Sequence, residues 1–222
     1  MAQVFGPDTF TVGADTNINA YPAGDADYAY NAGSGTDILV NAANDRAQNN
    51  AGVASRYARL IDAAVPTGNQ EHIVDGNSVL SDDACYISAR MATGGTLDQY
   101  SLNFSDNNQP TEVRLLRWDA GVAATLVSED RGLTGSATRR ARLRAIGSGA
   151  TISLGAQFDD TRELQYADTN ASRKTSGVPG FGYEGGAANT LWHDNLSVDD
   201  LAATGFQARC GTLTIGTGVA GT

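Results

Sequence analysis

The chain has 222 residues, of which 41% are hydrophobic and 18% are charged, a composition that excludes a disordered chain and allows one substantial core. The formal net charge of −10 would repel nucleic-acid phosphates and anionic lipid surfaces, so we expect neither nucleic acid nor a membrane among the partners. No segment approaches the roughly 18 consecutive apolar residues that a membrane-spanning helix needs.

Short strand-like runs begin close to the N-terminus. We predict strands at residues 9–12 and 37–41, separated by an acidic, aromatic stretch at residues 21–30 that leads into an exposed or half-buried strand. Residues 56–62 have some helix propensity, but their neighbours favour a strand.

From residue 79 onward, apolar and polar side chains alternate clearly. In residues 100–104 the apolar side chains fall on one face of a strand and the polar side chains on the other. A sheet with one apolar and one polar face is typical of an antiparallel sandwich, so the sequence predicts an all-β protein. The other strand-like runs are residues 85–90, 113–118, 141–146, 151–156, 180–183 and 191–198.

Polar segments separate these runs, and the longest exposed loop is expected at residues 168–178, which include Lys174, the one lysine among 15 basic residues. Shorter loops are expected at residues 92–96, 106–110, 119–123 and 129–139. We divide the chain into one β-domain at residues 1–201 and a Gly- and Thr-rich segment at 202–222. The latter holds one more strand-like run and suits inter-subunit docking by strand addition.

The order of these motifs resembles the concanavalin A-like (laminin G-like) jelly-roll superfamily. The resemblance implies a concanavalin A-like jelly-roll sandwich of two antiparallel sheets over about residues 8–201, and it says little about activity because one fold hosts many functions. The matching segments are Asp8-Thr-Phe10, Tyr100-Ser-Leu, Leu115-Leu-Arg-Trp118, Leu143-Arg-Ala-Ile-Gly147, Phe158-Asp-Asp160, Gly177-Val-Pro-Gly-Phe-Gly182 and Trp192-His-Asp-Asn-Leu-Ser-Val198.

Catalysis has little support in the sequence. Glycoside hydrolysis needs two carboxylates roughly 5–9.5 Å apart, and the hydrolases that share this jelly roll carry them in a pattern like Glu-x-Asp-x-x-Glu, which is missing here. Neither His72 nor His193 lies in a nucleophile or metalloprotease motif. We therefore predict no catalytic residues. The adjacent carboxylates point to opposite faces of a strand in the pairs Asp82-Asp83, Asp159-Asp160 and Asp199-Asp200.

Sugar binding needs aromatic rings for stacking and planar polar groups for the hydroxyls. Trp118 and Trp192 are expected to be buried in the sandwich. The strand pair Arg142 and Arg144 is open to three interpretations: solvation, pairing with acids such as Asp159, or contact with a ligand. The candidate glycan-binding residues are Tyr28, Tyr30, Arg90, Asn103, Arg142 and Arg144.

Relatives of this fold often bind calcium where the first and last strands meet, which points by position to Asp8 and Asp194, with Asn195 beside them. The alternative is that Asp8 caps the start of a strand and that Asp194 and Asn195 shape a turn. No other cofactor is expected. Cys85 and Cys210 could form a disulfide, but two cysteines in a long chain favour free, partly buried thiols.

A jelly roll of this kind usually works outside cells, whereas the N-terminus lacks the basic start and apolar run of a secretory signal. Release by lysis reconciles the two. We therefore expect a non-catalytic structural or surface protein of a phage virion, made in the host cytoplasm: a capsid decoration or a tail or fibre subunit. Its partners would be other virion subunits, itself in a homo-oligomer, and cell-surface glycans. The alternatives are a soluble carbohydrate-binding module and, less favoured, a polysaccharide-degrading enzyme.

Overall fold

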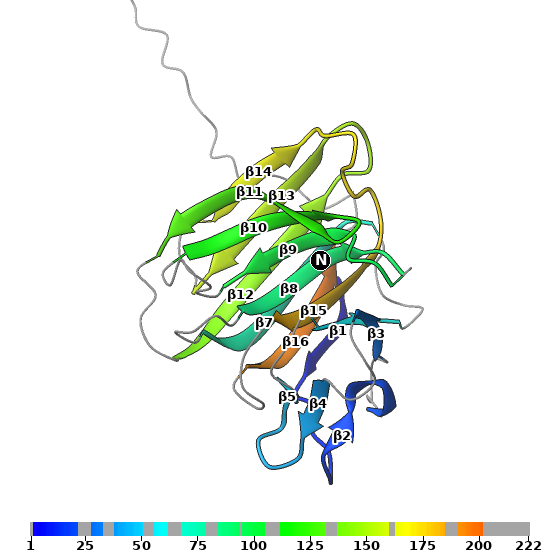
Figure 1. Cartoon of the computed structure of the whole chain (residues 1–222), viewed down its shortest axis with the longest axis vertical. Coiled ribbons are helices and arrows are strands. Elements are labelled where there is room, and N and C mark those ends of the chain that lie inside the picture. Colours follow the sequence, from blue (N-terminus) through cyan, green and yellow to red (C-terminus); the bar gives the residue numbers. More distant parts are fainter. Residues whose placement is uncertain are drawn as a thin grey trace, which may run out of the picture.

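Two antiparallel β-sheets make up the computed structural model (Figure 1). It describes residues 2–21, 28–32, 38–50, 56–61, 68–78, 84–93, 95–104, 112–131, 137–159, 163–184 and 191–201. Apart from one short 3-10 helix, η1 (Ile18–Ala20), the regular elements in this part of the chain are strands. The prediction of an all-β sandwich is confirmed.

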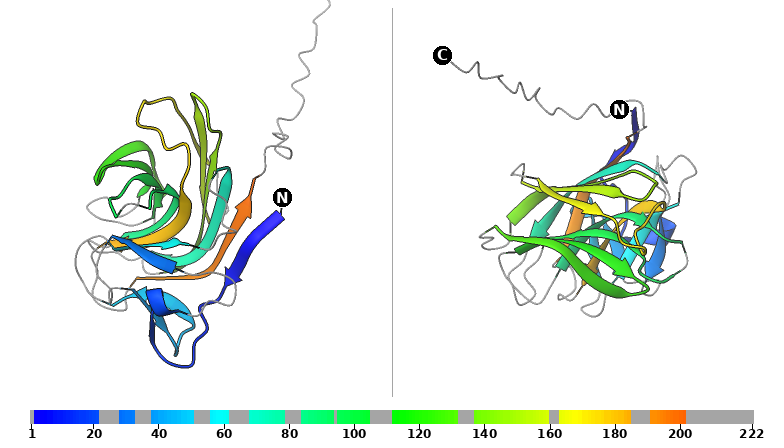
Figure 2. Two further views of the ribbon diagram at one scale, coloured as in Figure 1. Left: turned by 90° about the vertical axis from the view of Figure 1, so that its right-hand side faces the viewer. Right: turned by 90° about the horizontal axis from the view of Figure 1, so that it is seen from above.

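The larger sheet contains nine described strands in the order β14-β13-β12-β7-β16-β5-β4-β2, with β1 paired to β16. Figure 2 shows β1 lying alongside β16, so the first and last described strands are neighbours. The members of this sheet are β1 (Ala2–Asp8), β2 (Thr16–Asn17), β4 (Ile38–Asn41), β5 (Arg46–Asn49), β7 (Gln70–Ser78), β12 (Ala137–Ile146), β13 (Ile152–Phe158), β14 (Leu164–Asp168) and β16 (Trp192–Asp200).

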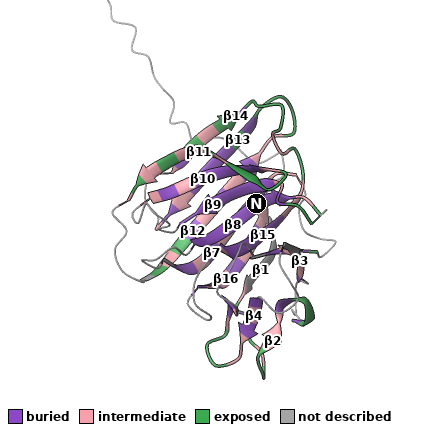
Figure 3. Ribbon diagram, viewed as in Figure 1, coloured by how far each residue is buried: buried purple, intermediate pink, exposed green. Residues whose placement is uncertain are grey.

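The smaller sheet contains seven described strands in the order β11-β10-β9-β8-β15-β6-β3. Buried residues follow its central strands, whereas exposed residues follow its edge strand β11 (Figure 3). Its members are β3 (Tyr28–Ala32), β6 (Arg56–Leu60), β8 (Ala84–Met91), β9 (Gln99–Asn103), β10 (Glu112–Asp119), β11 (Val122–Asp130) and β15 (Val178–Glu184).

The main core lies between the two sheets, and its pattern follows the predicted alternation. In β12, Ala141, Leu143 and Ala145 are fully buried, while Arg142 and Arg144 point to the opposite face of the sheet. Burial of each large apolar side chain contributes about 1.5–3 kcal/mol to folding, so this strand is fixed in register by its apolar face.

A second cluster of buried residues lies on the face of the seven-stranded sheet that points away from this core. Tyr57, Tyr86 and Trp118 pack against one another there, with ring centroids 5.5–6.2 Å apart. The predicted polar face of β9 therefore lies beside aromatic side chains, and its Ser101 and Asn103 are buried rather than exposed.

The prediction of a first strand at residues 9–12, including the segment from Asp8 to Phe10, is wrong. β1 ends at Asp8, whose carboxylate Oδ1 accepts a hydrogen bond from the backbone N–H of Phe10 at 2.9 Å. Phe10 has a positive φ of 49°, which turns the chain and places its ring in the core. An aspartate that bonds the backbone two residues further on favours such a turn over an extended strand.

Residues 202–222 lie outside the described residues, so the division of the chain at residue 201 and the docking role of this segment stay predictions. Within the described ranges, the structure contains no helix with the length and apolar character needed to cross a membrane.

Candidate functional site

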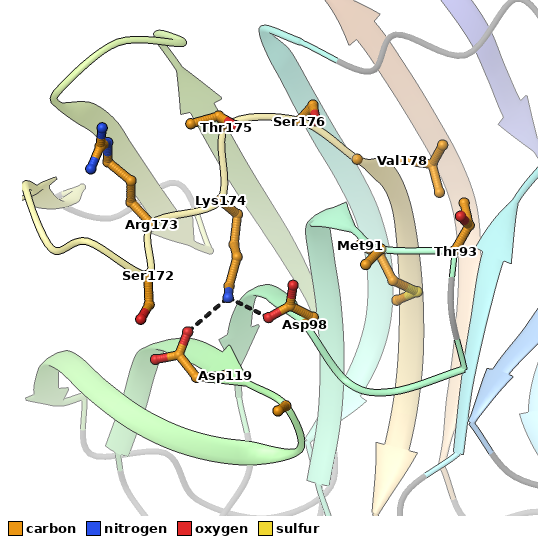
Figure 4. A pocket seen from close by; sticks show the side chains of 13 residues that line it. Met91, Thr93, Asp98, Asp119, Ser172, Arg173, Lys174, Thr175, Ser176 and Val178 are labelled. Atoms are coloured by element: carbon orange, nitrogen blue, oxygen red, sulfur yellow. Dashed lines mark hydrogen bonds and ion pairs between the residues drawn. The ribbon is translucent and has the colours of Figure 1, made fainter.

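A pocket of about 930 Å³ opens where three segments of the chain meet (Figure 4). Its walls are formed by residues 91–93 and 98, by the β10–β11 turn at 119–120, and by the loop at 172–178. The strand order β10-β9-β8-β15 explains why they meet. Neighbouring strands in this sheet are antiparallel. The last residues of β8 and β10 and the first residues of β9 and β15 therefore lie at the same end of the sheet, measured along the strands.

The β10–β11 connection is a tight hairpin whose tip is hydrogen-bonded to the loop between β8 and β9. Its central residues, Ala120 and Gly121, both have positive φ angles, 49° and 86°, as a two-residue type I′ turn requires. The N–H of Gly121 donates a 2.8 Å hydrogen bond to the carbonyl of Leu97. The turn therefore holds Asp119 next to Asp98.

Lys174 reaches into the pocket from the third segment and joins both carboxylates. Its Nζ forms an ion pair with Oδ1 of Asp119 at 2.7 Å and another with Oδ1 of Asp98 (Figure 4). Arg117 Nε donates to the second oxygen of Asp119 at 2.9 Å. Although partial burial alone would raise the pKa of Asp119, the hydrogen bonds from Lys174 and Arg117 lower it, so this carboxyl group stays ionised.

The loop that carries Lys174 is anchored on the sandwich by buried groups. The Lys174 N–H donates to the hydroxyl of Tyr100 at 3.0 Å, and the Lys174 carbonyl accepts from Arg90 Nη1 at 2.8 Å. Gly177 has φ 139°, and a Cβ there would lie 2.4 Å from the carbonyl carbon of Arg90, so only glycine fits. The Gln70 amide donates to the Gly177 carbonyl at 2.9 Å. The pocket is therefore preformed rather than loosely held.

The apolar wall of the pocket continues into the second cluster. Met91 lines the pocket and is also a member of the cluster that contains Trp118, and Val178 packs against that cluster. Trp118 lies opposite Gln99 in the strand register. Trp118 Nε1 and Gln99 Oε1 are both buried and have no hydrogen-bond partner among the described residues. The site thus combines apolar and charged lining residues, and a buried aromatic cluster lies next to it.

Three predicted glycan-binding residues do not lie at a surface, and that part of the prediction is wrong. Tyr28 is 2% exposed, because its hydroxyl donates to Asp8 Oδ2 at 2.8 Å and its ring packs in the core. Arg90 is fully buried and Asn103 is 1% exposed. Tyr30 pairs with Ala58 through its backbone, and its side chain lies outside the described part of the structure.

The other two predicted residues, Arg142 and Arg144, lie on the outward face of the nine-stranded sheet, away from the pocket. Both face the buried Glu71, at 3.8 and 3.6 Å, and Arg144 also pairs with Glu163. Of the three interpretations, pairing with acids is the one that the structure displays, although Asp159 pairs instead with Arg139. A ligand at Arg142 and Arg144 stays a prediction.

The two tryptophans differ in their surroundings. Trp118 is 7% exposed, as expected of a buried ring. Trp192 is only partly buried, and the guanidinium of Arg46 lies 5.0 Å from its ring centroid. Cys85 is buried, with its Sγ 3.8 Å from Oδ1 of Asn77, and Cys210 lies outside the described residues, so the expectation of two free thiols stays a prediction.

The predicted calcium ligands Asp8 and Asp194 lie near each other at the β1–β16 pair. Asp8 accepts hydrogen bonds from the Tyr21 hydroxyl at 2.7 Å and from the Tyr28 hydroxyl, and Asp194 accepts one from the N–H of Asn195 at 2.7 Å. Burial raises the pKa of Asp194, and the nearby Asp8 carboxylate adds to this effect. The described residues contain no group of three or more metal-binding acids, histidines or cysteines. Both oxygens of Asp8 thus already accept hydrogen bonds from the protein, and a calcium ion stays a prediction.

Sequence reasoning missed the pocket residues Asp98, Asp119 and Lys174 as a group. Each lies in or next to a loop that the sequence does predict, and Lys174 stands out as the one lysine. Their convergence depends on strand order, which the alternation of side chains does not reveal.

No family model and no curated protein matches the sequence. Solved structures do match the fold. The carbohydrate-binding module CBM66 from Bacillus subtilis is 11% identical, with a TM-score of 0.55 over 69% of this chain and 86% of that one. The carbohydrate recognition domain of Emp46p is 9% identical, with a TM-score of 0.55 over 77% and 87%. The β-glucanase of Bacillus licheniformis is 11% identical, with a TM-score of 0.53 over 85% and 98%. The chain therefore has the concanavalin A-like jelly-roll fold that its sequence resembles.

Proposed function

We propose that this chain is a non-catalytic carbohydrate-binding jelly roll that holds a glycan in the pocket around Lys174. The observation that carries the proposal is the combination of apolar lining residues, Ala92, Ala120 and Val178, with carboxylate, ammonium and hydroxyl groups in the same pocket. Sugars present both surfaces: their C–H faces pack on apolar side chains, and their hydroxyls exchange hydrogen bonds with planar polar groups.

The loop that carries Lys174 is held in place by contacts within the protein, which favours ligand binding at this pocket. Lys174 is tied to Tyr100 and Arg90 through its backbone, and its side chain is only 10% exposed. A site that is already ordered loses little conformational entropy when a ligand binds. Two of the proteins with this fold are a carbohydrate-binding module and a carbohydrate recognition domain, which supports the proposal.

The charges of the pocket favour binding over glycoside hydrolysis. Hydrolysis needs one carboxyl group that stays protonated, with a raised pKa, to donate a proton to the leaving oxygen. The pKa of Asp119 is instead lowered by Lys174 and Arg117, and Asp98 shares the same ammonium group. The two carboxylates are therefore suited to accept hydrogen bonds from sugar hydroxyls.

The test is a glycan array probed with the purified protein and with Lys174→Met. We expect micromolar binding to at least one glycan class and a loss of at least about tenfold in affinity, or 1.4 kcal/mol, in Lys174→Met. Arg140→Met is the matched control, since Arg140 lies on the other sheet with its side chain 52% exposed. Absence of binding, equal loss in both variants, or release of reducing ends from the bound glycan would contradict the proposal.

We further propose, from the sequence alone, that the protein works at the surface of a phage virion together with other subunits or copies of itself. A glycan pocket there would hold the particle to a cell-surface polysaccharide. Mass spectrometry of purified phage particles tests this placement. Absence of the protein from the particles would contradict the proposal.

A further inference from the structure

We infer that the pocket selects uncharged glycans and rejects anionic ones. This inference rests on the proposed carbohydrate-binding function and names the class of ligand for the same site. It follows from how the charged groups of the pocket are already paired.

The charged side chains that line the pocket sum to zero. Asp98 and Asp119 carry the negative charges, and Arg173 and Lys174 carry the positive ones. Because Lys174 Nζ contacts both carboxylates, its positive charge is already offset, and an anionic group that approached this ammonium would lie beside both Asp98 and Asp119. A uronate or sulfate would also approach within hydrogen-bonding range of carboxylates that carry its own sign of charge.

The second cation, Arg173, is also held by protein acceptors. Arg173 Nε donates to the carbonyl of Gly149 at 2.7 Å, and its Nη1 donates to the carbonyl of Asn170 at 3.0 Å. Its guanidinium points away from the ammonium group of Lys174 (Figure 4). The positive charges of the pocket are thus directed at protein acceptors, and the net charge of −10 on the chain repels polyanions at longer range.

The groups that remain for a ligand suit a neutral polyol. The Asp98 side chain is 40% exposed, so its carboxylate can accept hydrogen bonds from sugar hydroxyls. Ser172, Thr175 and Ser176 line the pocket, and their hydroxyls have no side-chain partner within the described residues. These groups add donors and acceptors without adding charge.

The test measures binding of soluble polysaccharides by titration calorimetry at low and high salt. The neutral probes are laminarin, mannan and xylan, and the anionic probes are polygalacturonate and alginate. We expect the wild-type protein to bind at least one neutral probe, with a Kd that changes less than about twofold between roughly 0.02 and 0.3 M salt, and to bind neither anionic probe. Tighter binding of an anionic probe would overturn the inference while leaving the carbohydrate-binding function standing. Binding of none of the five, together with an empty glycan array, would contradict the function itself.

A charge-altering variant gives a second, independent readout. Asp98→Asn combined with Asp119→Asn leaves two net positive charges in the pocket, so we expect this variant, unlike the wild-type protein, to bind polygalacturonate at low salt and to release it at high salt. The control, Asp75→Asn combined with Asp199→Asn, changes the net charge equally on the other sheet. An equal gain in the control, or no gain in a folded Asp98/Asp119 variant, would overturn the inference.

Discussion

Replacement of Arg90 by methionine is expected to lower the free energy of unfolding by at least about 4 kcal/mol. Arg90 is fully buried near the end of β8, where its positive φ of 54° turns the side chain away from the regular alternation. Its guanidinium donates to four backbone carbonyls, at Gly68 (3.2 Å), Ala145 (3.3 Å), Gly147 (2.6 Å) and Lys174 (2.8 Å).

These carbonyls belong to three different segments, so Arg90 ties together β12 of the larger sheet, the residues before β7 and the pocket loop. Methionine keeps an unbranched side chain but has no donor, and each carbonyl left buried without a partner costs about 1–3 kcal/mol. Urea unfolding measures the effect. Arg140→Met, whose side chain is 52% exposed, is the control and should lose under about 1 kcal/mol. A loss of that small size in Arg90→Met would show that the contacts of Arg90 are not what holds the loop.

Acidification from pH 7 to pH 4 is expected to cost the folded protein about 3 kcal/mol through His72 alone. Burial lowers the pKa of His72 from 6.5 to about 4, and burial lowers the pKa of His193 well below 6.5. As the pH falls through 6.5, the unfolded chain takes up protons that the folded core excludes. Stability is therefore complete above about pH 6.5 and is lost progressively down to about pH 4.

The surroundings of the two rings explain why the neutral form is favoured. His72 Nδ1 donates to the carbonyl of Ser88 at 3.3 Å, which fixes the tautomer, and its Nε2 has no partner among the described residues. The ring of His193 stacks on Tyr183 at 4.8 Å, with Phe181 at 5.2 Å. Neither ring has an acidic partner in the described part of the core that could stabilise an imidazolium.

Urea unfolding at pH 7, 5.5 and 4 measures this loss. Glu71 and Asp194, whose pKa values burial raises, act in the opposite direction, so a variant is needed to isolate the histidine. His72→Gln keeps a donor for Ser88 and cannot titrate, so it should lose less stability than the wild type over this range. An equal loss in the two proteins would exclude His72 as the cause.

Local pattern predicts those strands whose side chains alternate regularly. It predicts β9, β12 and β13, because each has apolar residues at every second position that face the core. It does not predict β7, a central strand of the larger sheet, since buried polar groups and a glycine interrupt its apolar side: Gln70, His72 and Gly76. A larger residue would be crowded at position 76, because a Cβ there would lie 3.0 Å from the His193 ring. This contact arises only in the folded sheet.

The burial of Tyr28 and Arg90 was missed for a similar reason, because distant residues decide whether a polar side chain can be buried. Tyr28 can enter the core since the Asp8 carboxylate, 20 residues earlier, accepts its hydroxyl hydrogen. Arg90 can enter because four carbonyls from other segments surround it. The pocket itself joins Asp98, Asp119 and Lys174, which come together through strand order and not through any local pattern.

The measurement that tests the central claim most directly is an NMR titration of the isotope-labelled protein with its best-binding glycan. We expect the amide signals of residues 91–93, 98, 119, 120 and 172–178, which line the pocket, to shift together and saturate at one Kd. Shifts confined to the outward face of the nine-stranded sheet around Arg142 and Arg144 would contradict the claim, and so would saturable binding that leaves the signals of these pocket residues unchanged.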